Sequence, residues 1–101
     1  MQLVKHESIL DLIERLKLII DFNVVKLIDN WEADLCAIGL INGNNMVYIS
    51  TWAYIEEETL MYDFDLEILD EKQIDTIHVV KKGRNVSEAE LVDEIRVFLG
   101  V

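Results

Sequence analysis

Proline is absent from this 101-residue sequence, cysteine occurs once and glycine occurs four times. Linkers and disordered tails are typically rich in proline or glycine, so this composition argues against them. Cys36 has no second cysteine to pair with, which excludes an intramolecular disulfide. The N-terminal residues lack the apolar core of a signal peptide, and the longest apolar run, residues 35–41, is too short to span a bilayer. We therefore expect a cytoplasmic protein with no membrane partner.

Basic residues are also scarce, because nine Lys and Arg stand against twenty Asp and Glu, for a formal net charge of −11. Binding to nucleic acid or to an anionic membrane needs clustered Lys and Arg, so we expect neither partner. Apolar residues make up 51% of the chain, which is enough for one hydrophobic core. We expect residues 1–101 to form a single domain.

Two segments have the pattern of amphipathic helices. In residues 8–22 apolar side chains recur at helical spacing, and Ser8 is suited to cap the start of the helix. Near the other end of the chain, Ser87 and Glu90 form a capping box and Gly100 follows the last apolar residue. The sequence therefore predicts an N-terminal and a C-terminal helix.

The residues between these helices have mainly the pattern of β-strands. Residues 33–41 and 46–54 are predicted strands joined by a turn at 42–45, and residues 59–69 alternate clearly between apolar and polar. A further strand is predicted from residue 74 or 76 to 81, followed by a turn at 82–85. Residues 24–32 are interpreted as a second short helix or an irregular turn, although Val24 and Val25 have strand character. The predicted fold is α+β, an antiparallel four-stranded meander with the N- and C-terminal helices packed on one face.

No segment carries a recognised catalytic motif. Cys36 and His78 could form a nucleophilic pair, but no orienting third group is evident, and His6 and His78 are too isolated to predict a zinc site. Asp63, Asp65 and Glu67 share one strand face and could bind a divalent cation, although the solvated face of a sheet has the same alternation. We expect no catalysis, no metal and no cofactor. A small divalent-metal-dependent enzyme that uses this acidic row is the alternative.

Negative charge is concentrated between residues 56 and 75, where nine acidic residues accompany a single basic one, Lys72. On the strand before it, Tyr48, Trp52 and Tyr54 alternate with apolar residues and are predicted to share the open face with the acidic row. Aromatic anchors beside carboxylates suit a surface that binds a cationic protein. The predicted partner-binding residues are Tyr48, Trp52, Tyr54, Glu56, Glu57, Glu58, Asp63, Asp65 and Glu67. The alternative is that these aromatics belong to an ordinary core and the carboxylates are merely solvated.

In overall character, an acidic, proline-free α+β chain with an aromatic and acidic sheet face resembles the immunity proteins of bacterial toxin–immunity pairs, including those of contact-dependent inhibition systems. The resemblance implies a protein that binds and blocks a toxin, often a nuclease with a positively charged active site. We therefore expect a non-catalytic acidic binding protein that neutralises a basic protein partner, such as a toxin domain. A homo-oligomerising structural or interaction module, in which a homodimer forms through the open sheet face, is a further alternative.

Overall fold

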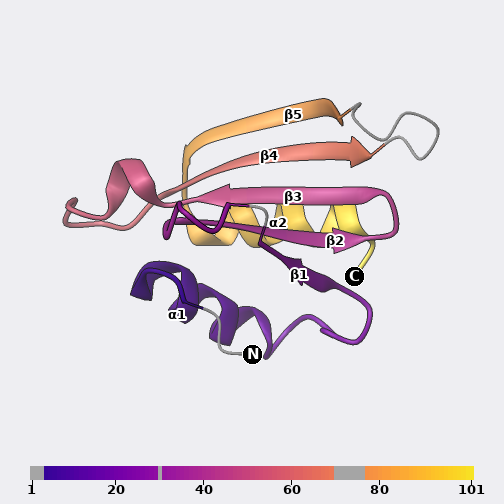
Figure 1. Cartoon of the computed structure of the whole chain (residues 1–101), viewed down its shortest axis with the longest axis horizontal. Helices are drawn as coiled ribbons and strands as arrows, with labels where there is room; N and C mark the ends of the chain where they lie inside the picture. The colour runs from indigo at the N-terminus through magenta and orange to yellow at the C-terminus, as the bar shows by residue number, and fades with distance from the viewer. Residues whose placement is uncertain (1–3, 30, 70–76) are drawn as a thin grey trace.

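The computed structural model describes residues 4–29, 31–69 and 77–101. In chain order these residues form α1 (Glu7–Leu16), β1 (Lys26–Ile28), β2 (Ala37–Asn42), β3 (Asn45–Ser50), the 3₁₀ helix η1 (Trp52–Tyr54), β4 (Tyr62–Leu69), β5 (Ile77–Val86) and α2 (Glu88–Leu99) (Figure 1). Neither α-helix of this described part has the length and apolar character needed to cross a membrane.

The strands form one antiparallel sheet in the order β1-β2-β3-β4-β5, so each strand pairs with the next one in the chain. The predicted α+β class and antiparallel meander are confirmed, but the predicted number of four strands is wrong. The fifth strand is β1, in the segment that the sequence indicated as a short helix or turn. Lys26, Leu27 and Ile28 pair with residues 39–41 of β2. Three residues are too few to establish a period, so this pairing is not visible in the local pattern.

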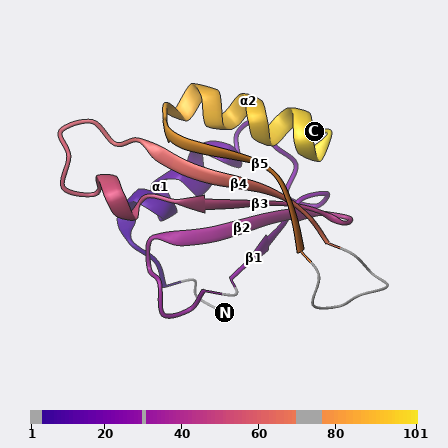
Figure 2. The same ribbon diagram turned by 90° about the horizontal axis from the view of Figure 1, so that it is seen from above.

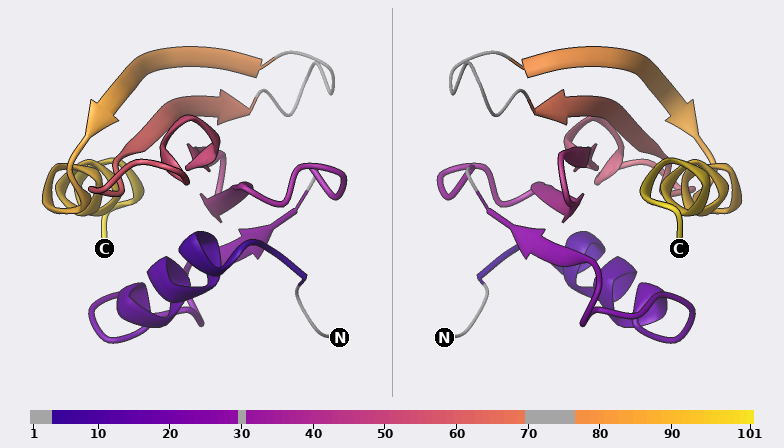
Figure 3. Two further views of the ribbon diagram at one scale, coloured as in Figure 1. Left: turned by 90° about the vertical axis from the view of Figure 1, so that its left-hand side faces the viewer. Right: turned by 90° about the vertical axis from the view of Figure 1, so that its right-hand side faces the viewer.

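Both helices lie on the same side of the sheet, which curves around them (Figures 2 and 3). The core between them is continuous, and β4 contributes Tyr62, Phe64 and Leu66 to it, as the alternation predicted. The other buried members come from the helices, from the segment after α1 and from β2 and β3: Ile9, Leu12, Ile13, Leu16, Ile20, Val25, Ile38, Leu40, Val47, Ile49, Leu91, Ile95 and Leu99. Among the described residues, no helix covers the opposite face of the sheet.

The helix ends agree with the sequence prediction at α2 and differ at α1. In α2 the Ser87 side chain accepts a hydrogen bond from the Glu90 N–H, and Gly100 ends the helix in the left-handed conformation with φ 70°. In α1 the cap is His6 and not Ser8, because His6 Nδ1 accepts from the Ser8 N–H at 3.1 Å. The helix also stops at Leu16 and not at Phe22, and the chain turns in the segment that follows.

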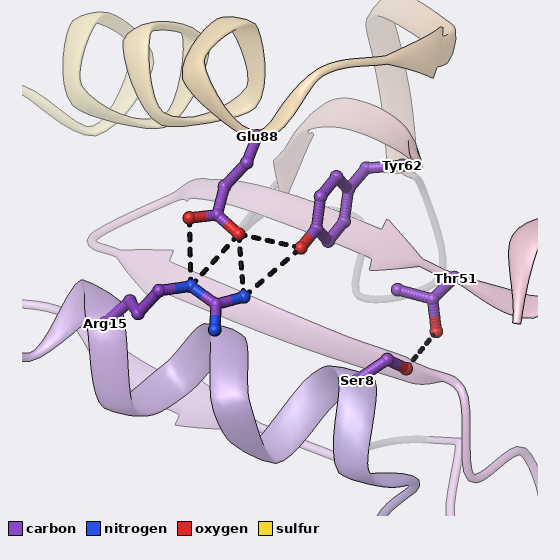
Figure 4. A network of polar contacts seen from close by, with 5 residues as sticks. All are labelled: Ser8, Arg15, Thr51, Tyr62 and Glu88. Atoms are coloured by element: carbon purple, nitrogen blue, oxygen red, sulfur yellow. Dashed lines mark hydrogen bonds and ion pairs between the residues drawn. The ribbon is translucent and has the colours of Figure 1, made fainter. Parts of the chain in front are cut away.

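The predicted strand over residues 46–54 is wrong in its last part, because β3 ends at Ser50 and residues 52–54 form η1. Thr51, at this junction, is completely buried, and its hydroxyl lies 2.8 Å from Ser8 Oγ in α1 (Figure 4). Its N–H donates to the Cys36 carbonyl at 2.9 Å. These contacts tie the end of β3 to α1 and to the segment before β2, which itself begins at Ala37 and not at residue 33.

The predicted turn at residues 82–85 is also wrong, because these residues continue β5 to Val86. Gly83 faces Phe64 across the pair of strands, and a Cβ at position 83 would stand only 1.9 Å from the Phe64 ring. The glycine is therefore required by a close approach and not by a turn. The predicted start of this strand, residue 74 or 76, lies outside the described residues.

Candidate partner-binding surface

The acidic row lies on the uncovered face of the sheet, as predicted, and Tyr48 lies beside it. Across the β3–β4 pair, Tyr48 faces Asp65, Ser50 faces Asp63 and Met46 faces Glu67. The aromatic Tyr48 and the three carboxylates therefore share one surface, although they do not present three free negative charges.

Asp63 is held by two donors from different parts of the chain. The Tyr54 hydroxyl donates to Asp63 Oδ1 at 2.5 Å, and the Asn85 N–H donates to the same oxygen at 3.1 Å. The hydrogen bond to Asp63 raises the pKa of Tyr54, because ionisation of the phenol would place two negative charges together. Asp63 thus connects η1, β4 and the end of β5.

Asp65 and Glu67 are also part of the sheet structure. Arg84 Nη1 lies 2.9 Å from Asp65 Oδ1 and donates to the Phe64 carbonyl at 3.0 Å. Glu67 is 9% exposed, and burial, with a smaller effect of the nearby Asp65, raises the pKa of its carboxyl. The row therefore has less effective negative charge than its composition indicates.

The row does not form a metal centre in this structure. Within residues 4–29, 31–69 and 77–101, no three His, Cys, Asp or Glu side chains come close enough together to hold a metal ion. The alternative of a metal-dependent enzyme at Asp63, Asp65 and Glu67 gains no support from this geometry.

Tyr48 is half-buried because Trp31 packs on it. Their ring centroids are 4.8 Å apart, with the planes inclined at 57°. The indole also crosses Gly39 of β2, where a Cβ would stand 3.1 Å from Trp31 Cζ3 and 2.6 Å from Ile28 Cγ2. This role of Trp31 is not visible in the local sequence pattern, because the contact joins residues seventeen positions apart.

Lys5, which no local sequence pattern indicates, holds the segment that carries Trp31. Its side chain is completely buried. Lys5 Nζ donates to the Trp31 carbonyl at 3.1 Å and to the Asp34 carbonyl at 2.8 Å, and it lies 2.7 Å from Asp29 Oδ1. Three oxygens thus satisfy the ammonium group, and the segment after β1 is fixed to the residues that precede α1.

Trp52 lies in η1 and is 69% exposed. It borders a mostly apolar hollow of about 550 Å³, whose other lining residues are His6, Ala33, Asp34, Leu35, Cys36 and Ile55. The same residue also borders a hollow of about 290 Å³ that Ala53, Ile55, Glu56 and Glu57 line with Trp52. Trp52 is therefore a wall shared by an apolar hollow and an acidic one.

Two further hollows continue from the same loop. One has a volume of about 660 Å³ and includes Tyr54, Glu57 and Glu58, and the other, of about 220 Å³, includes Glu57, Glu58 and the start of α1. The four hollows together are lined by six carboxylates and by no lysine or arginine: Glu7, Asp11, Asp34, Glu56, Glu57 and Glu58. We call the residues that line these four hollows the Trp52 surface.

The predicted binding residues thus fall into two groups. The first group, in η1 and the loop after it and not on the predicted strand face, belongs to the Trp52 surface: Trp52, Glu56, Glu57 and Glu58. The second group, on the sheet, comprises Tyr48, Asp63, Asp65 and Glu67. Tyr54 joins the groups, because its hydroxyl binds Asp63 while the residue lines one of the hollows.

Cys36 and His78, considered as a nucleophilic pair, are not brought together. Cys36 precedes β2 at the end of the sheet where Ser50 pairs with Asp63, whereas His78 pairs with Ile68 near the far end of β4. Cys36 is buried and lines the apolar hollow together with His6.

A separate polar network joins the two helices to the sheet (Figure 4). The Arg15 guanidinium lies 2.7 Å from Glu88 Oε1, and the Tyr62 hydroxyl donates to the same carboxylate at 2.8 Å. The hydrogen bond from Arg15 lowers the pKa of Glu88, while burial and the hydrogen bond to Glu88 raise the pKa of Tyr62 to about 12. This network connects α1, β4 and α2, so we interpret it as structural.

No protein-family model matches the sequence, and no curated protein or solved structure is significantly similar to the chain.

Proposed function

We propose that this chain is a non-catalytic binding protein that neutralises a basic protein partner, and that it acts as an immunity protein blocking a toxin nuclease. The observation that carries the proposal is the Trp52 surface. An exposed indole borders both an apolar hollow and several carboxylates, and no lysine or arginine of the described part of the chain lines the surface.

The two parts of this surface have different physical roles in the proposed complex. Burial of a large aromatic side chain at the centre of an interface supplies much of the affinity. Carboxylates around it attract a cationic partner over a distance and raise the association rate, an effect that salt screens. Trp52 is thus the proposed anchor, and Glu56, Glu57 and Glu58 are the proposed steering charges.

The carboxylates of the sheet take a supporting role in this proposal. Asp63 accepts hydrogen bonds from Tyr54 and Asn85, and Asp65 is paired with Arg84. The Arg84 cation compensates the charge of Asp65, and Asp63 is held by neutral donors, so both carboxylates position η1 and the adjoining strands. Glu56–Glu58 are exposed and carry the electrostatic attraction.

The test starts from the gene next to that of this chain, where the proposal predicts a basic toxin domain, and that domain is produced together with the chain. We expect the double variant Glu56→Lys, Glu57→Lys to associate with that domain at least about tenfold more slowly at low salt, with the difference shrinking as salt rises. The matched control is Glu90→Lys, Asp93→Lys, which makes the same change in net charge on the exposed side of α2. Equal association rates for the two variants, or an affinity that salt does not alter, would contradict the proposal.

A further inference from the structure

We infer that the Trp52 surface is a two-part site for a basic segment of the partner, in which one apolar side chain fills the apolar hollow beside Trp52 and an adjacent arginine binds against Glu56 and Glu57. This inference rests on the proposed function and specifies what the partner must present.

The larger hollow is suited to an aliphatic side chain. Ala33, Leu35 and Ile55 line it beside the indole. Its two polar lining residues are already hydrogen-bonded within the chain. His6 Nδ1 accepts from the Ser8 N–H, and Asp34 Oδ1 accepts from the Cys36 N–H at 3.0 Å. A leucine-sized side chain would therefore bury apolar surface there without displacing strong polar contacts.

The smaller hollow is suited to a guanidinium group. It joins the Trp52 indole to the carboxylates of Glu56 and Glu57. Arginine can stack on an aromatic face while its planar donors bind carboxylate oxygens in pairs, whereas lysine offers only a strongly hydrated point charge. Arginine is therefore the cation that this combination favours.

The walls of the site are held in place before a partner arrives. Lys5 fixes the carbonyls of Trp31 and Asp34, and Thr51 binds both Ser8 and the Cys36 carbonyl. Asp34 and Cys36, whose carbonyls accept two of these hydrogen bonds, line the apolar hollow. A preformed site loses less conformational entropy on binding. The difference in binding free energy between matching and mismatching segments is therefore preserved.

A second copy of this chain is a poorer occupant than a basic partner. At least five of the eight lysine and arginine residues in the described part already form ion pairs with the chain's own carboxylates: Lys5, Arg15, Lys17, Lys81 and Arg84. Charge complementarity therefore favours a partner that brings its own arginine.

The test uses short synthetic peptides that carry a leucine next to an arginine, with variants in which alanine replaces the leucine or neutral citrulline replaces the arginine. Binding is followed by the two indole N–H signals of the intact chain in nuclear magnetic resonance titrations. We expect the signal of Trp52 to move and that of Trp31 to stay. We expect each peptide variant to bind at least about tenfold more weakly than the parent peptide, a difference of about 1.4 kcal/mol.

Two protein variants complete the test. Trp52→Ala should abolish the preference for the parent peptide, and the fold should remain because the side chain is exposed. Val97→Ala, which removes another exposed apolar side chain, on α2, should bind like the unaltered chain.

Equal binding of the three peptides, movement of the Trp31 signal in place of that of Trp52, or a Trp52 signal that changes with protein concentration alone would overturn the inference. The last result would show a second copy at the site. The proposed function has a separate criterion, the effect of Glu56→Lys, Glu57→Lys on salt-dependent association with the toxin domain. The proposed function stands if that effect on association is found, even when the chain binds the three peptides equally.

Discussion

Gly83 shows how one contact across the sheet can determine which residue type a position accommodates. Phe64 is buried in the core and its ring occupies the space that a side chain at position 83 would need. The Phe64 ring can move only by displacing its core neighbours, since protein interiors are close-packed.

We predict that Gly83→Ala lowers the free energy of unfolding by about 1–3 kcal/mol, the usual cost of overpacking a core. Urea unfolding of the purified variant measures this loss. Gly43→Ala is the control, because a Cβ at Gly43 meets no atom within 4 Å and pays only for its positive φ of 61°, about 1 kcal/mol. A smaller effect at Gly83 than at Gly43 would contradict the close contact with Phe64.

Lys5 is the second residue whose contribution depends on remote partners. We predict that Lys5→Met lowers the free energy of unfolding by about 2–3 kcal/mol, because the Trp31 and Asp34 carbonyls and the Asp29 carboxylate lose their shared donor. The near-ultraviolet circular dichroism should weaken as well, since Trp31 would no longer be held on Tyr48. Lys17→Met, which removes an exposed ion pair with Glu14, should cost less than about 0.5 kcal/mol. A result for Lys5 as small as that for Lys17 would show that the buried ammonium has no structural role.

At the scale of secondary-structure elements, the helices are attached to the sheet by both apolar packing and polar contacts. Arg15 in α1, Tyr62 in β4 and Glu88 at the start of α2 meet in one network. Glu88 is in the first turn of α2, where a negative charge also interacts favourably with the helix dipole.

The network predicts a pH dependence of stability with opposite signs at the two ends of the scale. The folded-state pKa of Glu88 is lowered, so its contribution is present above the ordinary value of 4.5 and is lost as the pH falls through the lowered pKa. The folded-state pKa of Tyr62 is raised from 10.0 to about 12, so its contribution is complete below pH 10 and is lost as the pH rises through 12.

These contributions are measured by comparing urea unfolding of the unaltered chain with that of Glu88→Gln at acid pH and Tyr62→Phe at alkaline pH. We expect the stability difference to shrink toward low pH for Glu88→Gln and above pH 10 for Tyr62→Phe. Differences that stay constant through these ranges would show that the network is not formed in solution.

At the scale of the whole molecule, charge and the sheet edge both oppose self-association. The net charge of −11 makes two copies repel each other. On the edge strand β5, Lys81, Lys82 and Arg84 occupy neighbouring positions, and the pairing with β4 is interrupted by register shifts. Charged residues and bulges are known means of preventing edge-to-edge pairing.

We therefore predict that the isolated chain sediments as a monomer at micromolar concentration in physiological salt. Analytical ultracentrifugation at several concentrations provides the measurement. A stable homodimer would favour the alternative of an oligomerising module. A dimer that Trp52→Ala dissolves would, in addition, place the self-contact on the proposed partner site.

The candidate site was only partly predictable from the sequence. The acidic and aromatic character of residues 48–67 was visible, and Tyr48 shares the open face of the sheet with the acidic row as predicted, where it lies opposite Asp65. The sequence could not show that Tyr54 and Arg84 would bind Asp63 and Asp65, because these partners lie nine and nineteen residues away. Within residues 48–67 the exposed carboxylates are therefore those of Glu56–Glu58, in the loop after η1.

The sequence by itself determined the features that depend on neighbouring residues. Three such features are local: the hydrogen bond from the Glu90 N–H to the Ser87 side chain, the turn within residues 42–45 and the alternation of β4. Backbone geometry and hydrophobic periodicity are enough to specify them. Only the tertiary structure decided that residues 26–28 form an edge strand, that Gly83 lies within β5 and that Trp52 lies beside an apolar hollow among carboxylates. Each of these depends on segments that are distant in the chain and become neighbours only when both helices and the sheet close around one core.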